Sequence, residues 1–375
     1  MSRRKHGPIG LDVGARHVKA AQLSRASDGT LALEAIAMFP RAATSNATAL
    51  DAMEARRIGD VLFRRGFAGR ELVLAVPDER LMTASLELPP RSAEVPLDQI
   101  ARAEFARTLK ADSDAFEFAY WDLPAPARAS RATHVMGVGC LHAHAEPIID
   151  AFADAGSGYE VVAIDVGPCA LTRAAGAWIS SDDEITALVD IGWGAARLLV
   201  AHRGAVCYQR GLPGYGVERL TRAVRDQLGV DNLDLVDHLL RNVSLDSESI
   251  ETSSTDTNVL APSGPAAEEA QRAMCAHLDA ILAEVVTSLA YSSHQYPDAA
   301  ARRVLLCGGG ANFVGAGKYL SAKHKLDVRA VRPADVMSLA PALARANEAT
   351  DAALVLALGL ARHDNIGAGK ARAAA

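Results

Sequence analysis

The sequence contains little that marks a disulfide-bonded, nucleic-acid-binding or membrane-spanning protein. Its five cysteines are scattered and mostly lie within apolar runs, which is typical of reduced core thiols and not of a disulfide or zinc framework. Its 45 acidic residues outnumber its 39 basic ones, and no long basic run indicates a nucleic-acid partner. No uninterrupted apolar stretch is long enough to cross a bilayer. With 375 residues, 50% of them hydrophobic, the chain is expected to be globular, with two domains or one duplicated pair.

Two stretches far apart in the chain share one pattern: an apolar strand, an Asp-x-Gly turn and a second apolar strand. The first turn contains Asp12 and Gly14, and the second contains Asp190 and Gly192. A single turn of this kind is explained by local backbone hydrogen bonds of the aspartate. A carboxylate at the end of a buried strand is costly without a partner, however, and the adjacent glycine lets a ligand approach the backbone. Two such turns predict a duplicated domain with a charged ligand between its halves.

The order of the expected elements also repeats. Strand, strand, strand, helix, strand is expected within the first 80 residues and again from residue 186, which indicates an internal duplication. The elements expected in the first half lie at residues 9–14, 18–23, 31–39, 51–65 and 71–76. Those expected in the second half lie at residues 185–191, 197–201, 205–210, 215–228, 304–307 and 312–324.

Two insertions and a tail interrupt this repeat. We expect a first half at residues 1–80 plus 160–185, a small α+β insert at 81–159, a second half at 186–230 plus 302–365, a second insert at 231–301 and a flexible tail at 366–375. Within the second insert, residues 244–269 are rich in Ser, Thr, Asp and Glu. Such a segment buries too little apolar area to fold, so we predict that it is disordered.

Four stretches carry a resemblance to a known family. They are residues 10–19, residues 189–192 continued by 208–214 and 220–221, residues 162–174, and the Gly-rich run 304–315 ahead of 318–320. With these motifs the chain resembles the actin-like ATPase superfamily and, within it, the PilM family of type IV pilus assembly, which is related to FtsA. The resemblance implies an α/β fold, a duplicated actin-like (ribonuclease H-like) architecture. It also implies that residues 81–159 are the small subdomain shared with FtsA.

The same resemblance implies an ATP site between the halves. Asp12 and Asp190 would face Mg²⁺ and the phosphates, mostly through water, because Mg²⁺ gives up its hydration shell reluctantly. The turn amides around Gly14 and Gly192 would cradle phosphate oxygens, and Lys19 would add a positive charge. Four further glycines are implied to approach the nucleotide, namely Gly214, Gly308, Gly309 and Gly310.

The chain departs from its relatives at several of these positions. After Gly192, residues 193–196 offer no hydroxyl to a phosphate. Asp237 stands near the place where relatives carry a Glu/Lys pair, which leaves Arg241 as the substitute cation. Gly167, followed by proline, stands where chaperone-type relatives have a catalytic glutamate. Because water without a positioned base is activated poorly, we expect at most weak ATPase activity.

The function implied is that of a cytoplasmic, actin-like ATP-binding protein of type IV pilus or related secretion machinery. ATP binding would be coupled to capture of a short cytoplasmic peptide from a PilN-like, single-span inner-membrane partner. Two alternatives stay open: a non-hydrolysing scaffold of the same fold, and a small-molecule kinase for which Asp165 is the one acid to nominate. Self-association is a further possibility. Gly7 and Pro8 interrupt the basic start, so we expect no signal peptide and contact with the membrane only through a partner.

Overall fold

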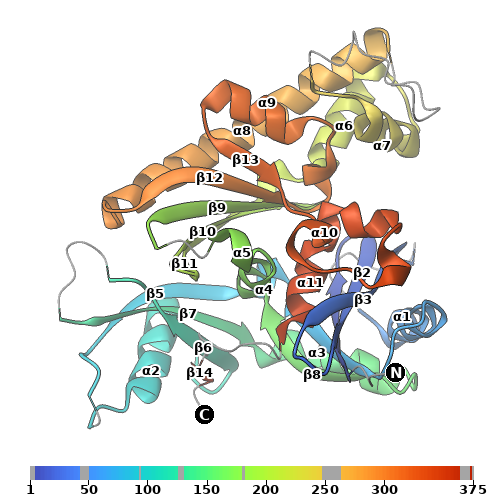
Figure 1. The fold of residues 1–375 in the computed structure, drawn as a ribbon. Helices are drawn as coiled ribbons and strands as arrows, with labels where there is room; N and C mark the ends of the chain where they lie inside the picture. The colour runs from blue at the N-terminus through green and yellow to red at the C-terminus, as the bar shows by residue number, and fades with distance from the viewer. Residues whose placement is uncertain are drawn as a thin grey trace.

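Two five-stranded sheets of identical topology dominate the computed structural model, which describes residues 5–42, 50–92, 94–125, 131–179, 182–246, 263–363 and 372–373 (Figure 1). The strand order is β3-β2-β1-β4-β8 in the first sheet and β11-β10-β9-β12-β13 in the second. In both sheets the first three strands pair antiparallel and the last two pairings are parallel. The internal duplication expected from the element order is therefore confirmed.

The strands of the first sheet are β1 (Lys5–Val13), β2 (His17–Arg25), β3 (Leu31–Pro40), β4 (Glu71–Val76) and β8 (Glu160–Val166). Those of the second are β9 (Glu184–Ile191), β10 (Ala196–His202), β11 (Ala205–Leu212), β12 (Ala300–Cys307) and β13 (Asp327–Ala330). The helices around these two sheets are α1 (Ala52–Arg64), α3 (His142–Asp154), α4 (Gly167–Ala174), α5 (Gly176–Ile179), α6 (Val217–Leu228), α7 (Leu233–Asn242), α8 (Pro265–Gln295), α9 (Ala316–His324), α10 (Pro333–Val336) and α11 (Val355–Ala361).

Helices α1 and α6 occupy equivalent places in the two halves, and local sequence sets where each ends. The Asp51 side chain accepts a hydrogen bond from the backbone N–H of Glu54 and so caps the start of α1. Gly66 follows the end of α1 at a φ of +80°, and Gly229 ends α6 at a φ of +64°. Left-handed backbone of this kind favours glycine, which explains why both expected helix ends are correct.

Helices α4 and α11 cross between the two sheets, and each packs on the sheet of the other half. Helices α4 and α5 leave the first sheet after β8 but pack through Leu171 and Ile179 on the second sheet. Helix α11 follows the second sheet but packs on β1 and β2 of the first, where a Cβ at Gly10 would overlap the backbone oxygen of Ala357 (Figure 1). Gly359 brings α11 against α4, since a Cβ there would overlap the backbone oxygen of Ala170. The two halves are thus joined by two exchanged helices in direct contact.

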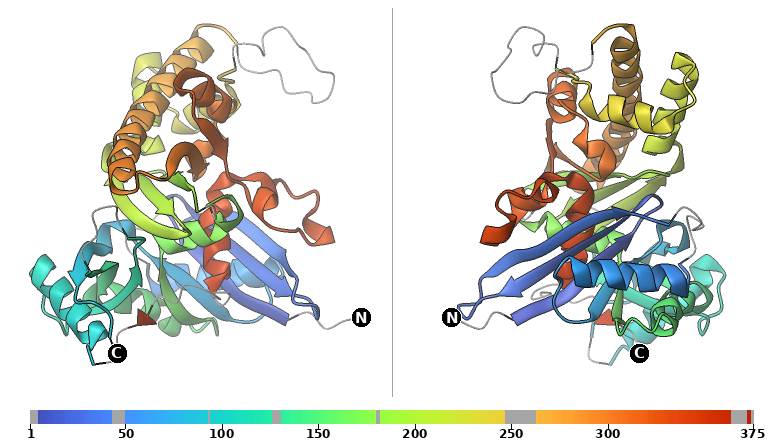
Figure 2. Two further views of the ribbon diagram at one scale, coloured as in Figure 1. Left: turned by 60° about the vertical axis from the view of Figure 1, so that its left-hand side comes forward. Right: turned by 90° about the vertical axis from the view of Figure 1, so that its right-hand side faces the viewer.

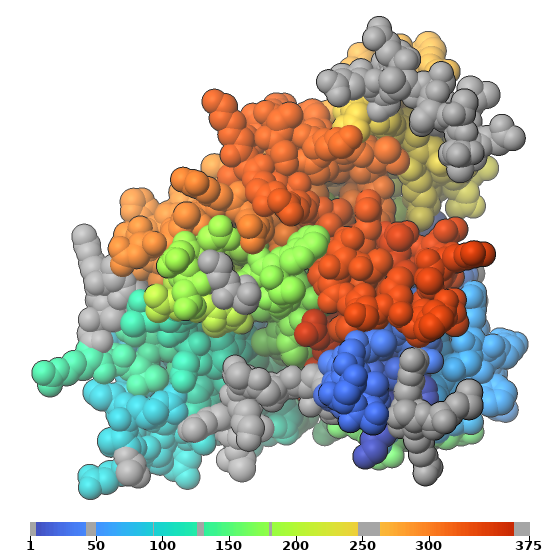
Figure 3. All heavy atoms as spheres, in the orientation of Figure 1, coloured from blue at the N-terminus to red at the C-terminus, as the bar shows by residue number. Residues whose placement is uncertain are grey.

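This exchange corrects two of the expected domain boundaries. Residues 302–365 were expected to belong to the second half, but their last part, from α10 onward, packs on the first sheet, where Leu339 bridges to Leu33 (Figure 3). Helices α4 and α5 were expected in the first half and cover the second sheet instead. On the opposite face of the first sheet lie α1 and α3 (Figure 2). The two faces of the sheet are buried by segments from distant parts of the chain.

The small insert has its own four-stranded sheet, in the order β14-β6-β7-β5, covered by α2. These elements are β5 (Met82–Leu88), α2 (Leu97–Leu109), β6 (Phe116–Asp122), β7 (Thr133–Leu141) and β14 (Arg372–Ala373). Its core centres on Phe105, whose ring lies 4.7 Å from that of Phe118 and 5.5 Å from that of Phe116. Helix α3, expected within this insert, buries Phe152 with α1 in the first half instead.

The flexible tail expected at residues 366–375 is wrong for two residues. Strand β14 pairs antiparallel with β6 through the register Arg372 to Tyr120 and Ala373 to Ala119. The remaining residues of that segment lie outside the described residues. The pairing brings the C-terminal part of the chain to the insert, on the side of its sheet away from β5.

The disordered segment expected at residues 244–269 is wrong at both of its ends. Leu245 is only 3% exposed, and its backbone N–H donates to the carbonyl of Val314 over 2.8 Å. Helix α8 already begins at Pro265 and runs to Gln295. Residues 247–262, between these ends, lie outside the described residues. Apolar side chains at the segment's margins, Leu245 and Ala267, join the core of the second half.

Helix α8 is also long and apolar enough, by length and composition, to cross a membrane, contrary to the expectation that no stretch is. Its buried residues include Met274, Leu278, Ile281, Val285 and Leu289, which join the core of the second half. The helix therefore packs as a core helix of this fold. All five cysteines are free thiols, as their scatter in the sequence predicts.

Candidate nucleotide site

The two Asp-x-Gly turns adopt the same geometry in the two halves. The N–H of Gly14 donates to the carbonyl of His17, and the N–H of Gly192 donates to that of Ala195, each over 3.0 Å. Each aspartate consequently stands at the end of the central strand of its sheet, Asp12 on β1 and Asp190 on β9. The duplication thus places two acidic corners in equivalent positions.

These two corners lie close enough to influence each other's charge. Burial raises the pKa of Asp190 to about 6; the Lys19 ammonium counteracts this rise, and the charge of Asp12 adds to it. The three groups therefore form one electrostatic unit that combines the first and second halves. Two neighbouring carboxylates with a single ammonium leave excess negative charge, which a divalent cation neutralises well.

Lys19 stands directly opposite Asp12 in the β1–β2 hairpin. Its Nζ donates to Asp12 Oδ2 over 2.6 Å, and the pair is largely buried. Burial alone lowers the pKa of Lys19, but Asp12, with smaller effects from Asp190 and Asp351, raises it above its usual value. The side chain is therefore held as a cation beside both acidic corners, where a phosphate group is attracted.

Among the glycines expected to approach a nucleotide, Gly308 has the tightest surroundings. Its φ is +79°, and a Cβ there would overlap Asp190 Oδ1 and lie 2.6 Å from the carbonyl oxygen of Ile191. Gly310 likewise packs on the Ile191 side chain, whereas Gly309 has open space on its Cβ side. The Gly-rich turn, residues 308–310, therefore packs against Asp190 and Ile191, while the space on the Cβ side of Gly309 is open.

Gly214 contacts Arg219, and another glycine packs on the second Asp-x-Gly turn. Gly214 lies in a short 3-10 turn, where its carbonyl accepts from Arg219 Nη1 over 3.2 Å. Gly216, two residues later, packs on the second Asp-x-Gly turn, because a Cβ there would overlap Trp193 O. Gly216 was not among the glycines expected to approach the nucleotide.

Four more side chains that the sequence did not point to reach the same region. Arg16 of the first turn lies over the Trp193 ring of the second turn, with 4.3 Å between the guanidinium carbon and the ring centre. Asp351, which acts on Lys19, is fixed by Asn312 Nδ2 over 2.7 Å. Arg197, on β10, stands directly opposite Asp190. The Arg16–Trp193 and Asn312–Asp351 contacts join residues far apart in the chain, so no local pattern marks them.

Helix α7 faces the first turn from the second insert. Asp237 and Asp234 lie 3.7 Å from the Arg16 guanidinium, and Arg241 donates to Asp237 over 3.1 Å. Burial, with the nearby cations Arg16, Lys19 and Arg241, lowers the pKa of His17 below its usual value. Asp237 and Arg241, the residues expected near the place of a Glu/Lys pair, therefore form an ion pair next to Arg16 of the first turn.

The residues present fit a magnesium–phosphate group held mainly through water. Within the described ranges, no cluster of three or more His, Cys, Asp or Glu forms a ready-made metal site. Mg²⁺ bound to nucleotides commonly uses one or two carboxylates together with phosphates and waters, and Asp12 and Asp190 supply that number. With a pKa of about 6, Asp190 is mostly ionised at neutral pH and available as a ligand.

The acid nominated for a kinase, Asp165, is held in a structural ion pair instead. Its carboxylate accepts from Arg173 and from the backbone N–H of Val166, and His363 Nδ1 lies 3.5 Å away. Although burial raises its pKa, these hydrogen bonds and the Arg173 charge lower it overall. A carboxylate with a lowered pKa is a poor general base at neutral pH, so this arrangement gives the kinase alternative no support.

Comparison with known proteins adds the family. The family model described as type IV pilus assembly protein PilM matches residues 10–364. The chain belongs to the PilM family. As a PilM family member it is an actin-like protein of type IV pilus assembly, and that part of the expected function is confirmed. No curated protein sequence matches it.

Solved structures establish the fold of this PilM family member. It is similar to a PilM–PilN type IV pilus biogenesis complex, with a TM-score of 0.74 and 18% identity over 95% of this chain and 97% of that one. It also resembles the ethanolamine utilization protein EutJ of Carboxydothermus hydrogenoformans, with a TM-score of 0.52 and 15% identity over 95% and 89%. MreB5 of Spiroplasma citri bound to ADP gives a TM-score of 0.50 and 13% identity over 96% and 98%. The expected duplicated actin-like fold is thus confirmed.

Proposed function

We propose that this PilM family member binds Mg²⁺–ATP between its two halves and couples that binding to capture of a cytoplasmic peptide from a PilN-like inner-membrane partner. The observation that carries the nucleotide half is the unit formed by Asp12, Lys19 and Asp190, whose charges act on one another across the cleft. An actin-like neighbour, MreB5, is bound to ADP in its solved structure. The Mg²⁺ of the bound nucleotide would neutralise the excess negative charge of this unit, and contacts from both halves to the nucleotide would hold the halves together.

Direct titration tests this proposal. We expect the purified chain to bind Mg²⁺–ATP, and Asp12→Asn and Asp190→Asn to weaken binding by roughly 10- to 100-fold, as loss of outer metal contacts commonly does. Asp28→Asn is the matched control, because Asp28 is an exposed turn aspartate that accepts a hydrogen bond from the Thr30 backbone. Binding that is absent in the unaltered chain, or equal in all four proteins, would overturn the nucleotide proposal.

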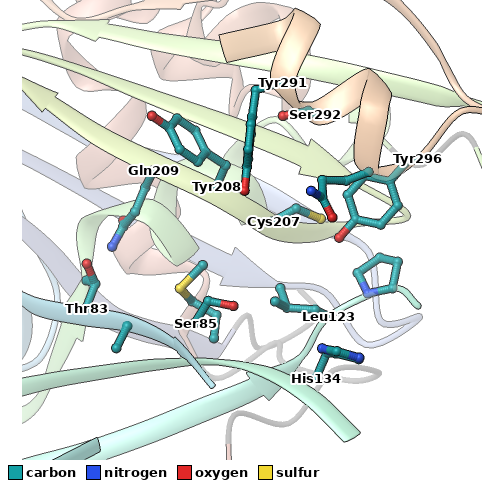
Figure 4. A pocket seen from close by; sticks show the side chains of 14 residues that line it. Thr83, Ser85, Leu123, His134, Cys207, Tyr208, Gln209, Tyr291, Ser292 and Tyr296 are labelled. Carbon is teal, nitrogen blue, oxygen red and sulfur yellow. The ribbon is translucent and has the colours of Figure 1, made fainter. Parts of the chain in front are cut away.

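A cleft between the insert and the second half is our candidate for the peptide. Its volume is about 270 Å³, and it separates β5 and β7 of the insert from β11 and the end of α8 (Figure 4). The side chains that line it include Thr83, Ser85, His134, Tyr208, Tyr291 and Tyr296. Both β5 and β11 are edge strands of their sheets, so backbone groups along this cleft are available to an extended segment.

A polar contact joins the insert to β11 of the second half. It is the hydrogen bond from Trp121 Nε1 in the insert to the carbonyl of Val206 on β11, over 2.9 Å. A ligand that pulls the two sheets together would therefore change the spacing of β5 and β11. In this way nucleotide binding and peptide binding become linked.

The partner is tested with a synthetic peptide from the cytoplasmic start of a single-span protein encoded beside this chain. We expect binding that tightens with Mg²⁺–ATP and weakens by about tenfold in Tyr291→Ala, since exposed aromatic residues often dominate such contacts. Phe63→Ala, an equally exposed aromatic residue on α1, is the control. In cells, the chain should sediment with inner membranes only when that partner is present. If Tyr291→Ala leaves the affinity for the peptide unchanged, the peptide binds at another site. If no peptide binding is detected, the proposed coupling is wrong.

One observation favours a second candidate, a scaffold that binds its partner without nucleotide. Several groups expected to contact phosphates already have partners: Lys19 bonds to Asp12, and the amides of Gly14 and Gly192 donate within their own turns. A scaffold would bind the peptide equally with and without ATP. Its melting temperature would also be unchanged by Mg²⁺–ATP, because only a ligand that binds the native state raises it.

A further inference from the structure

Arg197 is a buried cation in the cleft whose hydrogen-bonding capacity is only partly used. The residue is 7% exposed and lies on β10, directly opposite Asp190. Its Nη2 forms an ion pair with Asp78, while its buried Nη1 has no hydrogen-bond partner among the described residues. A buried charged donor without a partner is unfavourable, so its presence calls for a ligand.

The free Nη1 is on the nucleotide side of the second sheet. Residues that stand directly opposite each other on antiparallel strands project from the same face, so Arg197 and Asp190 share a face. The charge of Asp12 also acts on Arg197 and partly offsets the effect of burial, which lowers the pKa of Arg197 to about 10. The guanidinium therefore belongs to the same electrostatic environment as both acidic corners.

The backbone at Gly167 makes room for this side chain. Gly167 begins α4, and a Cβ there would overlap Arg197 Nη1. This is the position at which a catalytic glutamate was expected to be missing. The space that a side chain at position 167 would take is occupied by a guanidinium from the second half.

The ion pair with Asp78 connects the cleft to the insert. Asp78 lies in the 3-10 turn Asp78–Arg80, between β4 of the first sheet and β5, the first strand of the insert. Its side chain is half exposed, whereas that of Arg197 is 9% exposed. The contact therefore ties the centre of the second sheet to the segment at which the chain enters the insert.

We propose that Arg197 is a phosphate-responsive latch: its free Nη1 donates to the terminal phosphate of ATP, and that phosphate competes with Asp78 for the guanidinium. The inference rests on the proposed function, because it requires a nucleotide between Asp12 and Asp190. The oxygens of a terminal phosphate are strong acceptors for arginine, and the phosphate group as a whole carries more negative charge than one carboxylate. Engagement of ATP would loosen the Asp78 contact and free the start of β5, whereas ADP, which lacks that phosphate, would leave the contact in place.

Nucleotide affinities test the latch. We expect Arg197→Gln to weaken ATP binding by roughly 10- to 100-fold and ADP binding by less than about threefold, since only ATP carries the contacting phosphate. Asp78→Asn should strengthen ATP binding by about three- to tenfold, because it removes the competing carboxylate. Arg302→Gln, an exposed strand arginine on β12, is the matched control and should leave both affinities unchanged.

A second readout reports on the insert itself. In the unaltered chain, ATP but not ADP should increase amide hydrogen exchange over residues 78–84, and this increase should vanish in Arg197→Gln. Because Asp78 is half exposed, Asp78→Asn keeps the test valid even if loss of the buried arginine impairs folding.

The possible results separate the two proposals. In the first case the unaltered chain binds ATP, but Arg197→Gln and Asp78→Asn have the same ratio of ATP to ADP affinity as the control Arg302→Gln. The latch is then wrong, and the nucleotide proposal stands. If the unaltered chain binds neither nucleotide, both are overturned. A shift of the ratio in opposite directions in Arg197→Gln and Asp78→Asn supports the latch.

Discussion

The guanidinium of Arg16 stacks on the ring of Trp193, with 4.3 Å between them, so the tips of the two Asp-x-Gly turns touch across the cleft. Arg16 belongs to the first half and Trp193 to the second. Trp193 also belongs to the segment after Gly192 in which relatives were expected to offer a hydroxyl to a phosphate. In this protein the segment supplies an aromatic contact between the halves, so polar contacts to a phosphate would come from other segments.

Removal of this stack should weaken the contact between the two halves, which is measurable as a change in the free energy of unfolding. We expect Arg16→Gln and Trp193→Leu to show a coupling of about 0.5–1 kcal/mol in the free energy of unfolding, the range for partly exposed cation–π pairs. A double-mutant cycle in urea measures it. The pair Arg57→Gln and Phe39→Leu, whose guanidinium and ring are 5.8 Å apart, should couple more weakly. Additive effects of Arg16→Gln and Trp193→Leu would show that the stack contributes nothing.

The raised pKa of Asp190 makes stability depend on pH. Its folded pKa of about 6 is above the ordinary value of 3.8, so the folded state holds the proton more tightly than the unfolded state. This contribution is fully present below about pH 4 and is lost as pH rises through 6, with an order of magnitude of 2–3 kcal/mol. Asp190→Asn should remove that loss. The measurement is urea unfolding at pH 4, 5, 6 and 7, and parallel curves for the two proteins would contradict the prediction.

The same titration should govern nucleotide binding, in the opposite direction. A carboxylate contributes to a magnesium site only when ionised, so the affinity for Mg²⁺–ATP should rise between pH 5 and 7 and level off above the Asp190 pKa of about 6. In Asp190→Asn the affinity should be lower and nearly independent of pH over this range. Calorimetric titration in matched buffers tests this, and an unchanged pH profile in the variant would assign the effect to another group.

Gly308 and Gly309 form a matched pair for the Gly-rich turn. Gly308→Ala should destabilise the fold by about 1–3 kcal/mol, because its φ is +79° and a methyl group there would overlap the Asp190 carboxylate. Gly309→Ala, with no heavy atom within 4 Å of the added methyl, should change stability by less than about 0.5 kcal/mol. Thermal unfolding distinguishes them. Equal effects would mean that the approach of Gly308 to Asp190 is not required.

The contact between the exchanged helices rests on another glycine. Gly359→Ala adds a good helix former to α11, but the methyl group would overlap the Ala170 carbonyl on α4, so we expect a net loss of about 2 kcal/mol or more. Gly176→Ala, in α5 with open space around it, should be neutral or stabilising. Chemical unfolding of both variants measures these changes in stability. A gain in stability for Gly359→Ala would contradict the prediction, because α4 and α11 would then have moved apart at no cost in free energy.

Much of the fold followed from local patterns that depend on few residues. The compact apolar run at residues 71–76 predicted β4 with its correct bounds. The Asp-x-Gly turns predicted two equivalent corners, because turn geometry depends on short-range backbone hydrogen bonds. By contrast, the expected disorder at residues 244–246 was wrong, because Leu245 is buried in the core of the second half and its backbone N–H donates to the carbonyl of Val314, which composition could not reveal.

The sequence by itself determined the duplicated element order, the two acidic corners and the glycines beside them, since each depends on neighbours along the chain. Only the tertiary structure decided that α4 and α11 exchange sheets, that Gly216 packs on the second turn, and that Arg197 reaches Asp78. These contacts join segments far apart in the sequence, and their energies come from burial and charge created by folding. No local pattern encodes a partner that only the folded chain brings near.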